Sequence, residues 1–175
     1  MTIKTIFLDR DGVINKEINY LHKIEDFEFI DGVFEACQYL KSLDYKIIII
    51  TNQSGISRGY FTERDFQIIT NWMLAEFKKK DIKILDVFHC PHLPDSNCNC
   101  RKPMPGMLLK AKYKHNIDMQ SSWLIGDTEV DIIAANSSGI TNTILVKSGH
   151  KINEFDSNAK YILESIHQSS KVIIS

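Results

Sequence analysis

The segment FLDRDG, residues 7–12, closes a short apolar run and sets two carboxylates directly behind it. The run from Ile3 to Leu8 has the length and composition of a buried β-strand. Asp9 and Asp11 are two residues apart, so they share one face of the chain while the backbone stays extended. This stretch therefore predicts a strand whose end presents two acids to one substrate.

Short apolar runs alternate with helical patterns along the rest of the chain. Four further strands are predicted at 45–51, 84–90, 123–125 and 143–146. Helices are predicted at 31–43, 62–80, 106–115 and 128–138, and the tail at 159–174 reads as a short strand or a pair of helices. The alternation indicates an α/β fold, with one parallel sheet between two layers of helices.

The carboxyl ends of parallel strands meet at one edge of a sheet, where such folds bind their ligands. The residues that follow the predicted strands are Asp9 to Gly12, Thr51 to Gly55, the cysteine-rich loop that ends at Arg101, Lys102 and Pro103, and Gly126 to Thr128. Three carboxylates among them would converge, and like charges at close range need protons or a cation to coexist. Oxygen ligands favour a hard ion such as Mg²⁺, so a magnesium site is predicted at Asp9, Asp11 and Asp127.

The same set of side chains suits phosphoryl transfer. A carboxylate can attack phosphorus and form an aspartyl-phosphate, the role predicted for Asp9. Asp11 would protonate the leaving oxygen and then activate water. Thr51 and Lys102 would supply a hydroxyl group and a positive charge to the phosphoryl oxygens, because this chemistry depends on positioning and charge stabilisation.

A loop rich in cysteine precedes the Arg-Lys pair. Cys90, His92, Cys98 and Cys100 offer three thiolates and one imidazole within eleven residues. Four such ligands suit a tetrahedral structural Zn²⁺ and leave no position for a reactive water. A free or disulfide-bonded cluster is the alternative, and a reducing cytosol disfavours it. Because the loop leads directly into Arg101, bound zinc would restrict the movement of the cations that follow.

Size and charge narrow the classes of partner. The chain has 175 residues, 43% of them hydrophobic, and a net charge of -1, which fits one domain over residues 1–175. A near-neutral chain has no electrostatic footprint for nucleic acid. No stretch approaches the ~20 apolar residues of a membrane-spanning helix, and no signal-peptide pattern is present, so we expect a cytoplasmic monomer that binds no membrane.

Four segments match the motifs of a known superfamily. They are FLDRDG (7–12), ITNQ (50–53), RKP (101–103) and GDTEVD (126–131). On these motifs the chain resembles the haloacid dehalogenase superfamily, over about residues 3 to 150. A narrower resemblance, to the heptose-bisphosphate phosphatases, is carried by FEFIDGV (27–33), NQSGISRGYFT (52–62) and CNCRKPMPGML (98–108).

The resemblance implies a Rossmann-like sheet of haloacid dehalogenase type with a zinc-binding loop and no separate cap domain. It implies a Mg²⁺-dependent phosphatase that removes the 7-phosphate of D-glycero-D-manno-heptose 1,7-bisphosphate through an aspartyl-phosphate. That reaction would belong to the biosynthesis of nucleotide-activated heptose, which is used for bacterial surface polysaccharide such as lipopolysaccharide. The small-molecule partner would then be a sugar bisphosphate.

The resemblance also implies roles for single residues. Asp11 would touch Mg²⁺ through its backbone carbonyl, and Asp131 would be a further acid near the metal. Arg101 would bind the anomeric phosphate, and Thr128 stands where a lysine is frequent in the family. The substrate would be lined by Glu17, Ile18, Asn19, Tyr20, Thr51, Asn52, Gln53, Ser54, Arg101, Lys102 and Thr128.

Three other functions remain open. The short spacer between His92 and Cys98 also resembles histidinol-phosphate phosphatases. A signalling receiver module has a similar α/β fold and a phosphorylated Asp, but it lacks an acid two residues after it, and here Asp11 is present. A zinc-bearing interaction protein with an inactive site would be expected to have lost one of the three acids.

Overall fold

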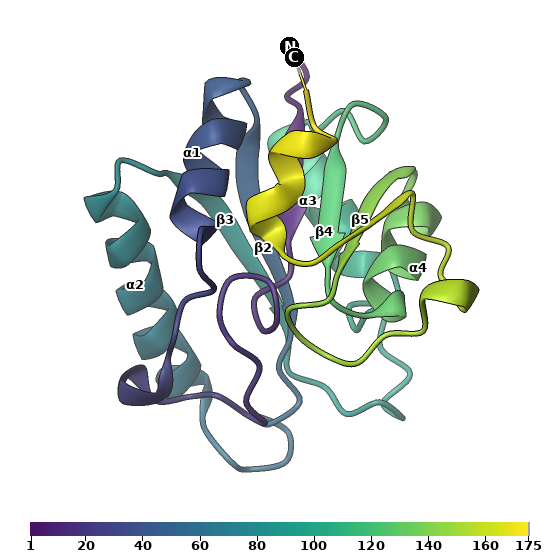
Figure 1. Cartoon of the computed structure of the whole chain (residues 1–175). Helices are drawn as coiled ribbons and strands as arrows, with labels where there is room; N and C mark the ends of the chain where they lie inside the picture. The colour runs from purple at the N-terminus through teal and green to yellow at the C-terminus, as the bar shows by residue number, and fades with distance from the viewer. Residues whose placement is uncertain (175) are drawn as a thin grey trace.

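The apolar runs of the sequence form the strands of one parallel sheet, in the order β3-β2-β1-β4-β5-β6. The computed structural model describes residues 1–174 (Figure 1). The strands are β1 (Thr5–Leu8), β2 (Lys46–Asn52), β3 (Ile84–Cys90), β4 (Trp123–Gly126), β5 (Asn142–Val146) and β6 (Tyr161–Leu163). The five strands predicted from the sequence are confirmed, with their ends shifted by at most two residues.

The helices also begin and end close to the predicted residues. They are α1 (Val33–Ser42), α2 (Glu63–Lys79), α3 (Gly106–His115) and α4 (Glu129–Ser138), with short 3-10 helices η1 (Ile24–Asp26), η2 (Glu154–Asp156) and η3 (Ile166–Lys171). Thr62 and Asp65 form the capping box that starts α2. Gly139 ends α4 with a φ of 95°, a left-handed conformation that glycine adopts without a steric penalty.

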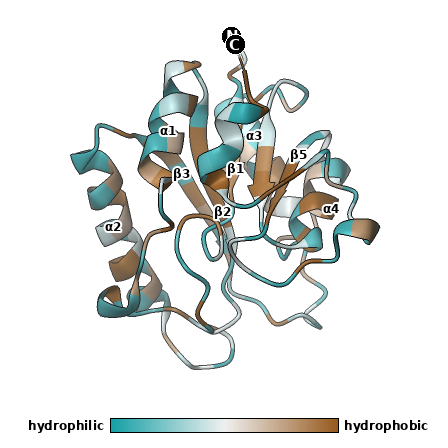
Figure 2. Ribbon diagram, viewed as in Figure 1, coloured by the Kyte–Doolittle hydropathy of each residue, from teal (hydrophilic) through white to brown (hydrophobic). Residues whose placement is uncertain are grey.

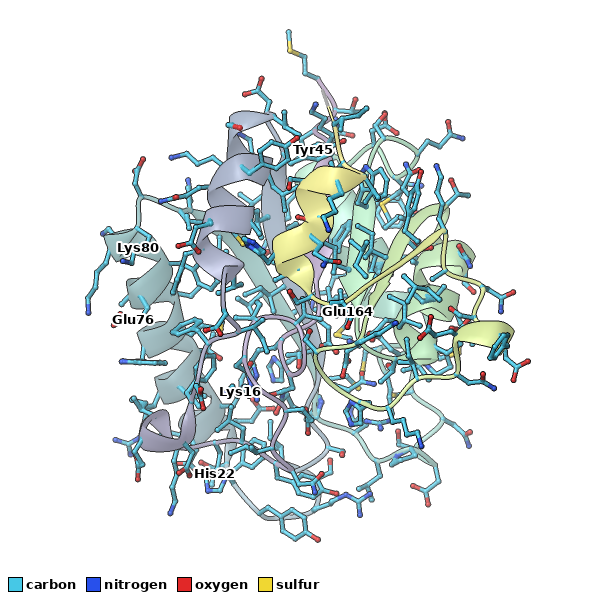
Figure 3. All side chains as sticks on the ribbon, viewed as in Figure 1. Lys16, His22, Tyr45, Glu76, Lys80 and Glu164 are labelled. Atoms are coloured by element: carbon cyan, nitrogen blue, oxygen red, sulfur yellow. The ribbon has the colours of Figure 1, made fainter. Side chains whose placement is uncertain are left out.

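Successive residues of the central strands face opposite layers. On β1, Ile6 and Leu8 pack in the cluster that includes residues of α1 and α2, while Phe7 packs in the cluster that includes residues of α3 and α4. Figure 2 shows hydrophobic residues along the central strands and on parts of the helices that cover them. The polar side chains of Glu76, on α2, and of Lys80, the residue after α2, lie at the outer margin of the molecule (Figure 3). The central strands are buried on both faces of the sheet, which explains why their segments are continuous apolar runs in the sequence.

The C-terminal tail adds a strand to the five that the sequence predicts. Tyr161–Leu163 pairs with β5 in parallel and adds a sixth strand, and η3 packs against α1. For this segment the sequence predicts either a short strand or a pair of helices, because a pattern of three partly buried residues is too short to distinguish the two. Among the described residues, the segment between β1 and α1 holds only the single-turn helix η1, so no cap domain is inserted there. The described helices include none that is both long and apolar enough to cross a membrane.

The topology places the candidate site. The helices that follow β1 and β2 cover one face of the sheet, whereas those that follow β3 and β4 cover the other. The direction of winding therefore changes between β1 and β4, and ligands bind at such a point in doubly wound sheets. Asp9 follows β1 and Asp127 follows β4, so these two acids meet at the change of direction. The loops after the strands gather at the lower end of Figure 1, opposite the chain termini.

Candidate active site

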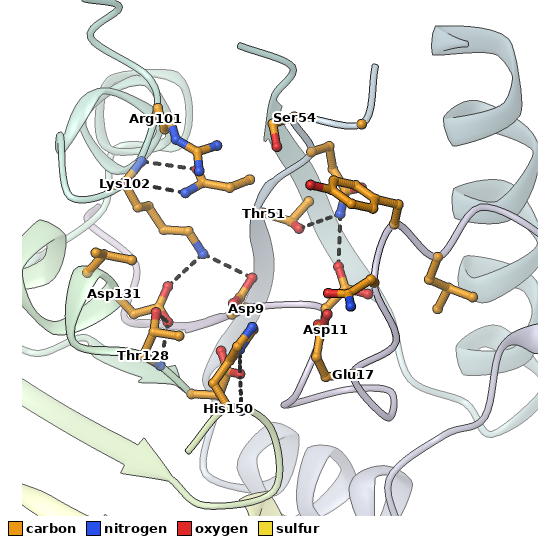
Figure 4. A pocket seen from close by; sticks show the side chains of 18 of the residues that line it. Asp9, Asp11, Glu17, Thr51, Ser54, Arg101, Lys102, Thr128, Asp131 and His150 are labelled. Carbon is orange, nitrogen blue, oxygen red and sulfur yellow. Dashed lines mark hydrogen bonds and ion pairs between the residues drawn. The ribbon is translucent and has the colours of Figure 1, made fainter. Parts of the chain in front are cut away.

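Asp9 lies at the end of the central strand in a buried ionic cluster. Its Oδ1 is 2.9 Å from Nζ of Lys102, and the same Nζ is 2.6 Å from Oδ1 of Asp131 (Figure 4). Only 3% of the Lys102 side chain is exposed. Burial raises the pKa of Asp9 well above its ordinary value, and Lys102 offsets only part of this because Asp131 and Asp127 add negative charge.

The end of strand β2 holds Lys102 in place. The side-chain amide of Asn52 donates to the backbone carbonyl of Lys102 over 3.1 Å and accepts from its backbone N–H over 3.0 Å. Nζ of Lys102 also donates to the carbonyl of Ile50 at 3.2 Å. Asn52 ends β2, so the strand itself fixes the position of the lysine that follows the cysteine loop.

Asp11 accepts four hydrogen bonds. Arg10 donates from Nε to Oδ2 at 3.1 Å and from Nη2 to Oδ1 at 2.9 Å, a bidentate contact. Asn15 donates to Oδ1 and Gln53 to Oδ2, each over 2.9 Å. Gln53 also donates to Oγ1 of Thr51 at 2.9 Å. Both oxygens of Asp11 therefore act only as acceptors in this arrangement.

Asp127 is enclosed by glycine backbone and by a histidine that the sequence analysis missed. Oδ2 of Asp127 accepts from the backbone N–H of His150 at 2.9 Å and lies 2.6 Å from its Nδ1. A β-carbon on Gly12 or Gly149 would overlap with this oxygen. The contact raises the pKa of His150. The rule used for the other loops could have found His150, because it follows the strand predicted at 143–146.

The buried acids suit a hard cation. Asp9, Asp127 and Asp131 each offer an oxygen within 4.8 Å of the other two. Lys102 is the cation that pairs with two of them, so the cluster holds more negative than positive charge. Burial raises the pKa of Asp127, and the negative charge of Asp131 raises it further. Carboxylate oxygens are the donors that Mg²⁺ prefers, and the residues present fit that ion.

The carboxylate cluster of the structure and the predicted magnesium ligands share Asp9 and Asp127. Asp131 joins the cluster as a carboxylate. The carboxylate of Asp11 lies outside it and is taken up by Arg10 and its other donors. The backbone contact expected of Asp11 stays a prediction. The strand-end rule includes Arg10, but the burial of its side chain and its contact with Asp11 become visible only in the fold.

The predicted zinc ligands come together at the end of β3 and in the loop that follows it. Sγ of Cys98 lies 3.6 Å from Sγ of Cys90 and of Cys100, and Nδ1 of His92 lies 3.4 Å and 3.2 Å from the same two sulfurs. With Zn–S of about 2.3 Å, tetrahedral geometry separates sulfurs by roughly 3.8 Å. The distance between Sγ of Cys90 and Sγ of Cys100, 2.8 Å, is too long for a disulfide and shorter than the separation of two sulfurs on one zinc ion. The four side chains are close enough together to form a possible zinc site.

One cleft of about 300 Å³ gathers the residues proposed for catalysis, magnesium and substrate. Fourteen of them line it: Asp9, Asp11, Glu17, Ile18, Asn19, Tyr20, Thr51, Asn52, Gln53, Ser54, Arg101, Lys102, Asp127 and Thr128. Asp131 and His150 line it as well. Burial raises the pKa of Glu17 to about 7, and the charge of Asp11 adds to the shift. The cleft therefore combines buried acids with two cations, Arg101 and Lys102.

Known proteins share this sequence and fold. A family model described as HAD-hydrolase-like matches residues 99–169. D-glycero-alpha-D-manno-heptose-1,7-bisphosphate 7-phosphatase of Photorhabdus laumondii is 51% identical over 164 residues, with 90% of each chain covered. The chain belongs to the heptose-bisphosphate phosphatase family.

Other members of the heptose-bisphosphate phosphatase family agree. The alpha enzyme of Campylobacter jejuni is 48% identical over 95% of this chain and 96% of its own. The beta enzyme of Escherichia coli K12 is 40% identical over 94% of this chain and 91% of its own. The crystal structure of D,D-heptose 1,7-bisphosphate phosphatase from B. bronchiseptica, complexed with magnesium and phosphate, superposes with a TM-score of 0.85 at 28% identity, covering 97% of each chain. The predicted superfamily and family are confirmed.

Proposed function

We propose that this protein hydrolyses the 7-phosphate of D-glycero-D-manno-heptose 1,7-bisphosphate with Asp9 as the nucleophile. The observation that carries the proposal is the single cleft in which Asp9, Lys102 and Arg101 lie together. The family relationship supports the substrate. Because the alpha-named relatives from Photorhabdus and Campylobacter are more similar to the chain than the beta-named one from Escherichia coli, we propose the alpha anomer as the preferred substrate.

Asp9 would attack the phosphorus atom, and the bond from phosphorus to the sugar 7-oxygen would break. Lys102 and Thr51 would hold the non-bridging oxygens of the transferred group, and Lys102 would spread positive charge over them. Asp11 would donate a proton to the departing 7-oxygen. Water would then attack the aspartyl-phosphate, give its proton to Asp11 and release phosphate from Asp9.

Asp11 needs a proton for this role. In the structure its two oxygens accept four hydrogen bonds, two of them from Arg10. The O–H of a protonated carboxyl group points where an incoming donor would otherwise lie. Asp11 would therefore lose one of its four accepted hydrogen bonds when it carries a proton for the substrate. Gln53 lines the cleft, and its hydrogen bond to Oδ2 is the one that a substrate oxygen would replace.

Two metals belong to the proposal. Asp9 and Asp127 would hold Mg²⁺ with Asp131 beside them, and the ion would neutralise charge on the carboxylates and the phosphoryl group. Cys90, His92, Cys98 and Cys100 would hold a structural Zn²⁺. The backbone N–H of Gln53 donates to the carbonyl of Cys90 over 2.7 Å, which ties the cysteine loop to the cleft.

Arg101 would bind the anomeric phosphate. It lines the cleft next to Lys102, and its Nη1 donates to the carbonyl of His92 at 3.3 Å. The guanidinium therefore lies where the cysteine loop meets the cleft, and there it would suit an anion at the far end of the sugar. The residues Glu17, Ile18, Asn19 and Tyr20 would contact the sugar from the opposite loop, after β1.

We also propose that the chain works as a single-domain monomer. On the outer strand β3, Oδ1 of Asp86 accepts the backbone N–H of Val87 over 2.9 Å. A carboxylate that occupies an edge amide disfavours pairing with a strand of a second copy at that residue. Sedimentation analysis tests this point, and a stable dimer through β3 would contradict it.

A phosphate-release assay with Mg²⁺ tests the function. The substrates are both anomers of the heptose bisphosphate, fructose 1,6-bisphosphate and histidinol phosphate. We expect kcat/KM to be highest for the alpha heptose bisphosphate. Histidinol phosphate is included because the short spacer between His92 and Cys98 also occurs in the alternative resemblance. A higher kcat/KM for histidinol phosphate than for either heptose would overturn the proposal.

A further inference from the structure

The loop after β5 closes over the buried carboxylate of Asp127. Oγ of Ser148 donates to the carbonyl of Gly12 over 2.7 Å, which fastens this loop to the loop after β1. The backbones of Gly12 and Gly149 pass so close to Oδ2 of Asp127 that neither position has room for a β-carbon. The carboxylate therefore sits in a slot made by two glycine backbones.

His150 completes this slot from the side of the cleft. Its backbone N–H donates to Oδ2 of Asp127 at 2.9 Å, and its ring Nδ1 lies 2.6 Å from the same atom. An ionised carboxylate only accepts, so Nδ1 carries the proton in this contact. The Asp127 side chain is 1% exposed, whereas the imidazole of His150 is 53% exposed.

The two oxygens of Asp127 are consequently unequal. Oδ2 accepts both donors of His150, while Oδ1 accepts no hydrogen bond from any of residues 1–174 that the structure describes. Asp131 differs, since Lys102 pairs with one of its oxygens and Thr128 donates to the other. Within the carboxylate cluster, Asp127 is held at one oxygen and open at the second.

We propose that His150 is a positioning residue for Asp127: it fixes Oδ2 and leaves Oδ1 for Mg²⁺. The inference rests on the proposed magnesium-dependent activity. Groups that hydrogen-bond a metal-binding carboxylate set its orientation, and their loss typically weakens metal binding by about 10- to 100-fold. Because the ring is half exposed and the backbone N–H remains in any variant, the loss at His150 falls near the lower end, about 10-fold.

Two substitutions separate positioning from other roles. His150→Ala removes the ring contact, while His150→Asn keeps an N–H donor at about the place of Nδ1. His167→Ala is the matched control, because this histidine is exposed on η3 and does not line the cleft. Mg²⁺ binding is measured by titration calorimetry without substrate, and KM and kcat are then measured at several Mg²⁺ concentrations.

We expect His150→Ala to bind Mg²⁺ about 10-fold more weakly, with kcat at saturating Mg²⁺ within a few-fold of the parent and KM for the sugar unchanged. His150→Asn restores most of the Mg²⁺ affinity, and His167→Ala matches the parent. Unchanged Mg²⁺ affinity in folded His150→Ala, a rise in KM for the sugar alone, or a failure of folded His150→Asn to restore binding would overturn the inference. Calorimetry needs no heptose, so a wrong substrate assignment would leave this comparison intact.

Discussion

Nζ of Lys102 lies 2.9 Å from Oδ1 of Asp9, although the two residues belong to loops that follow different strands. The lysine is almost fully buried and shares its charge with Asp131 at 2.6 Å. A buried cation between two carboxylates can stabilise the fold and also stabilise charge on a transferred phosphoryl group. Substitutions can separate these two contributions.

Lys102→Met should cost about 3–5 kcal/mol of unfolding free energy and abolish activity, because it leaves two buried carboxylates without their cation. The double variant Lys102→Met, Asp131→Asn should regain part of the stability and none of the activity. Urea unfolding and phosphate release measure the two effects. Lys110→Met, on the exposed side of α3, is the control. Parent-like stability of Lys102→Met would show that the ion pair contributes nothing to the fold.

Arg101→Met should raise KM for the bisphosphate by about 10- to 100-fold, since a hydrogen bond to a charged group contributes about 1.5–3 kcal/mol. KM for heptose 7-phosphate, which lacks the anomeric phosphate, should stay the same. Arg64→Met, on an exposed position of α2, serves as the control. Equal losses for both substrates would mean that Arg101 acts at the 7-phosphate or only through the loop.

Loss of zinc should loosen the cleft without removing the magnesium ligands. Cys100→Ser is expected to lose bound zinc, melt at a lower temperature and show a higher KM, with Mg²⁺ binding retained. Cys37→Ala is the matched cysteine control, because Cys37 lies on the buried face of α1, away from the zinc ligands, and this variant should keep one zinc per chain. Metal analysis, calorimetry and kinetics follow these effects. A parent-like KM in zinc-free Cys100→Ser would contradict the clamping role.

Asp86 provides a pH-dependent test of the edge of the sheet. The pKa of Asp86 lies below its ordinary value because hydrogen bonds from Lys114 and His115 outweigh the effect of burial. The group therefore stabilises the fold above its unfolded pKa of about 3.9, and this contribution is lost as the pH falls through the lower folded value.

Asp86→Asn should accordingly be less stable than the parent at pH 7, and the difference should vanish in strong acid. Urea unfolding between pH 7 and pH 2 measures it. Asp44→Asn gives a comparison at an exposed acid. A difference between Asp86→Asn and the parent that is constant over this range would refute the electrostatic origin.

The positions that the sequence predicted best are those where local pattern and topology agree. The run Ile47 to Ile50 suits a buried strand, and the strand-end rule then placed Thr51 and Lys102 in the same region. Fourteen residues, selected in this way or implied by the family resemblance, line one cleft. Hydrophobic pattern and sheet topology supply those that follow the strands, whereas Glu17, Ile18, Asn19 and Tyr20 came from the resemblance alone.

The remaining features depend on tertiary contacts. The strand Tyr161–Leu163 is too short to stand out from its surroundings, and it forms because β5 offers a free edge. His150 follows a predicted strand, yet its contact with Asp127 depends on the close passage of Gly149 and Gly12. Burial of Arg10 likewise becomes visible only when the loop after β1 has folded over it.

The central claim is that Asp9 carries the phosphoryl group during turnover. Rapid acid quench of the enzyme with the heptose bisphosphate, followed by borohydride reduction, converts a phosphorylated aspartate into homoserine that peptide mass spectrometry locates. We predict homoserine at position 9 and none at Asp11, with no conversion in Asp9→Asn. Turnover of the bisphosphate in the absence of any modified residue 9, or homoserine at position 11, would contradict the account.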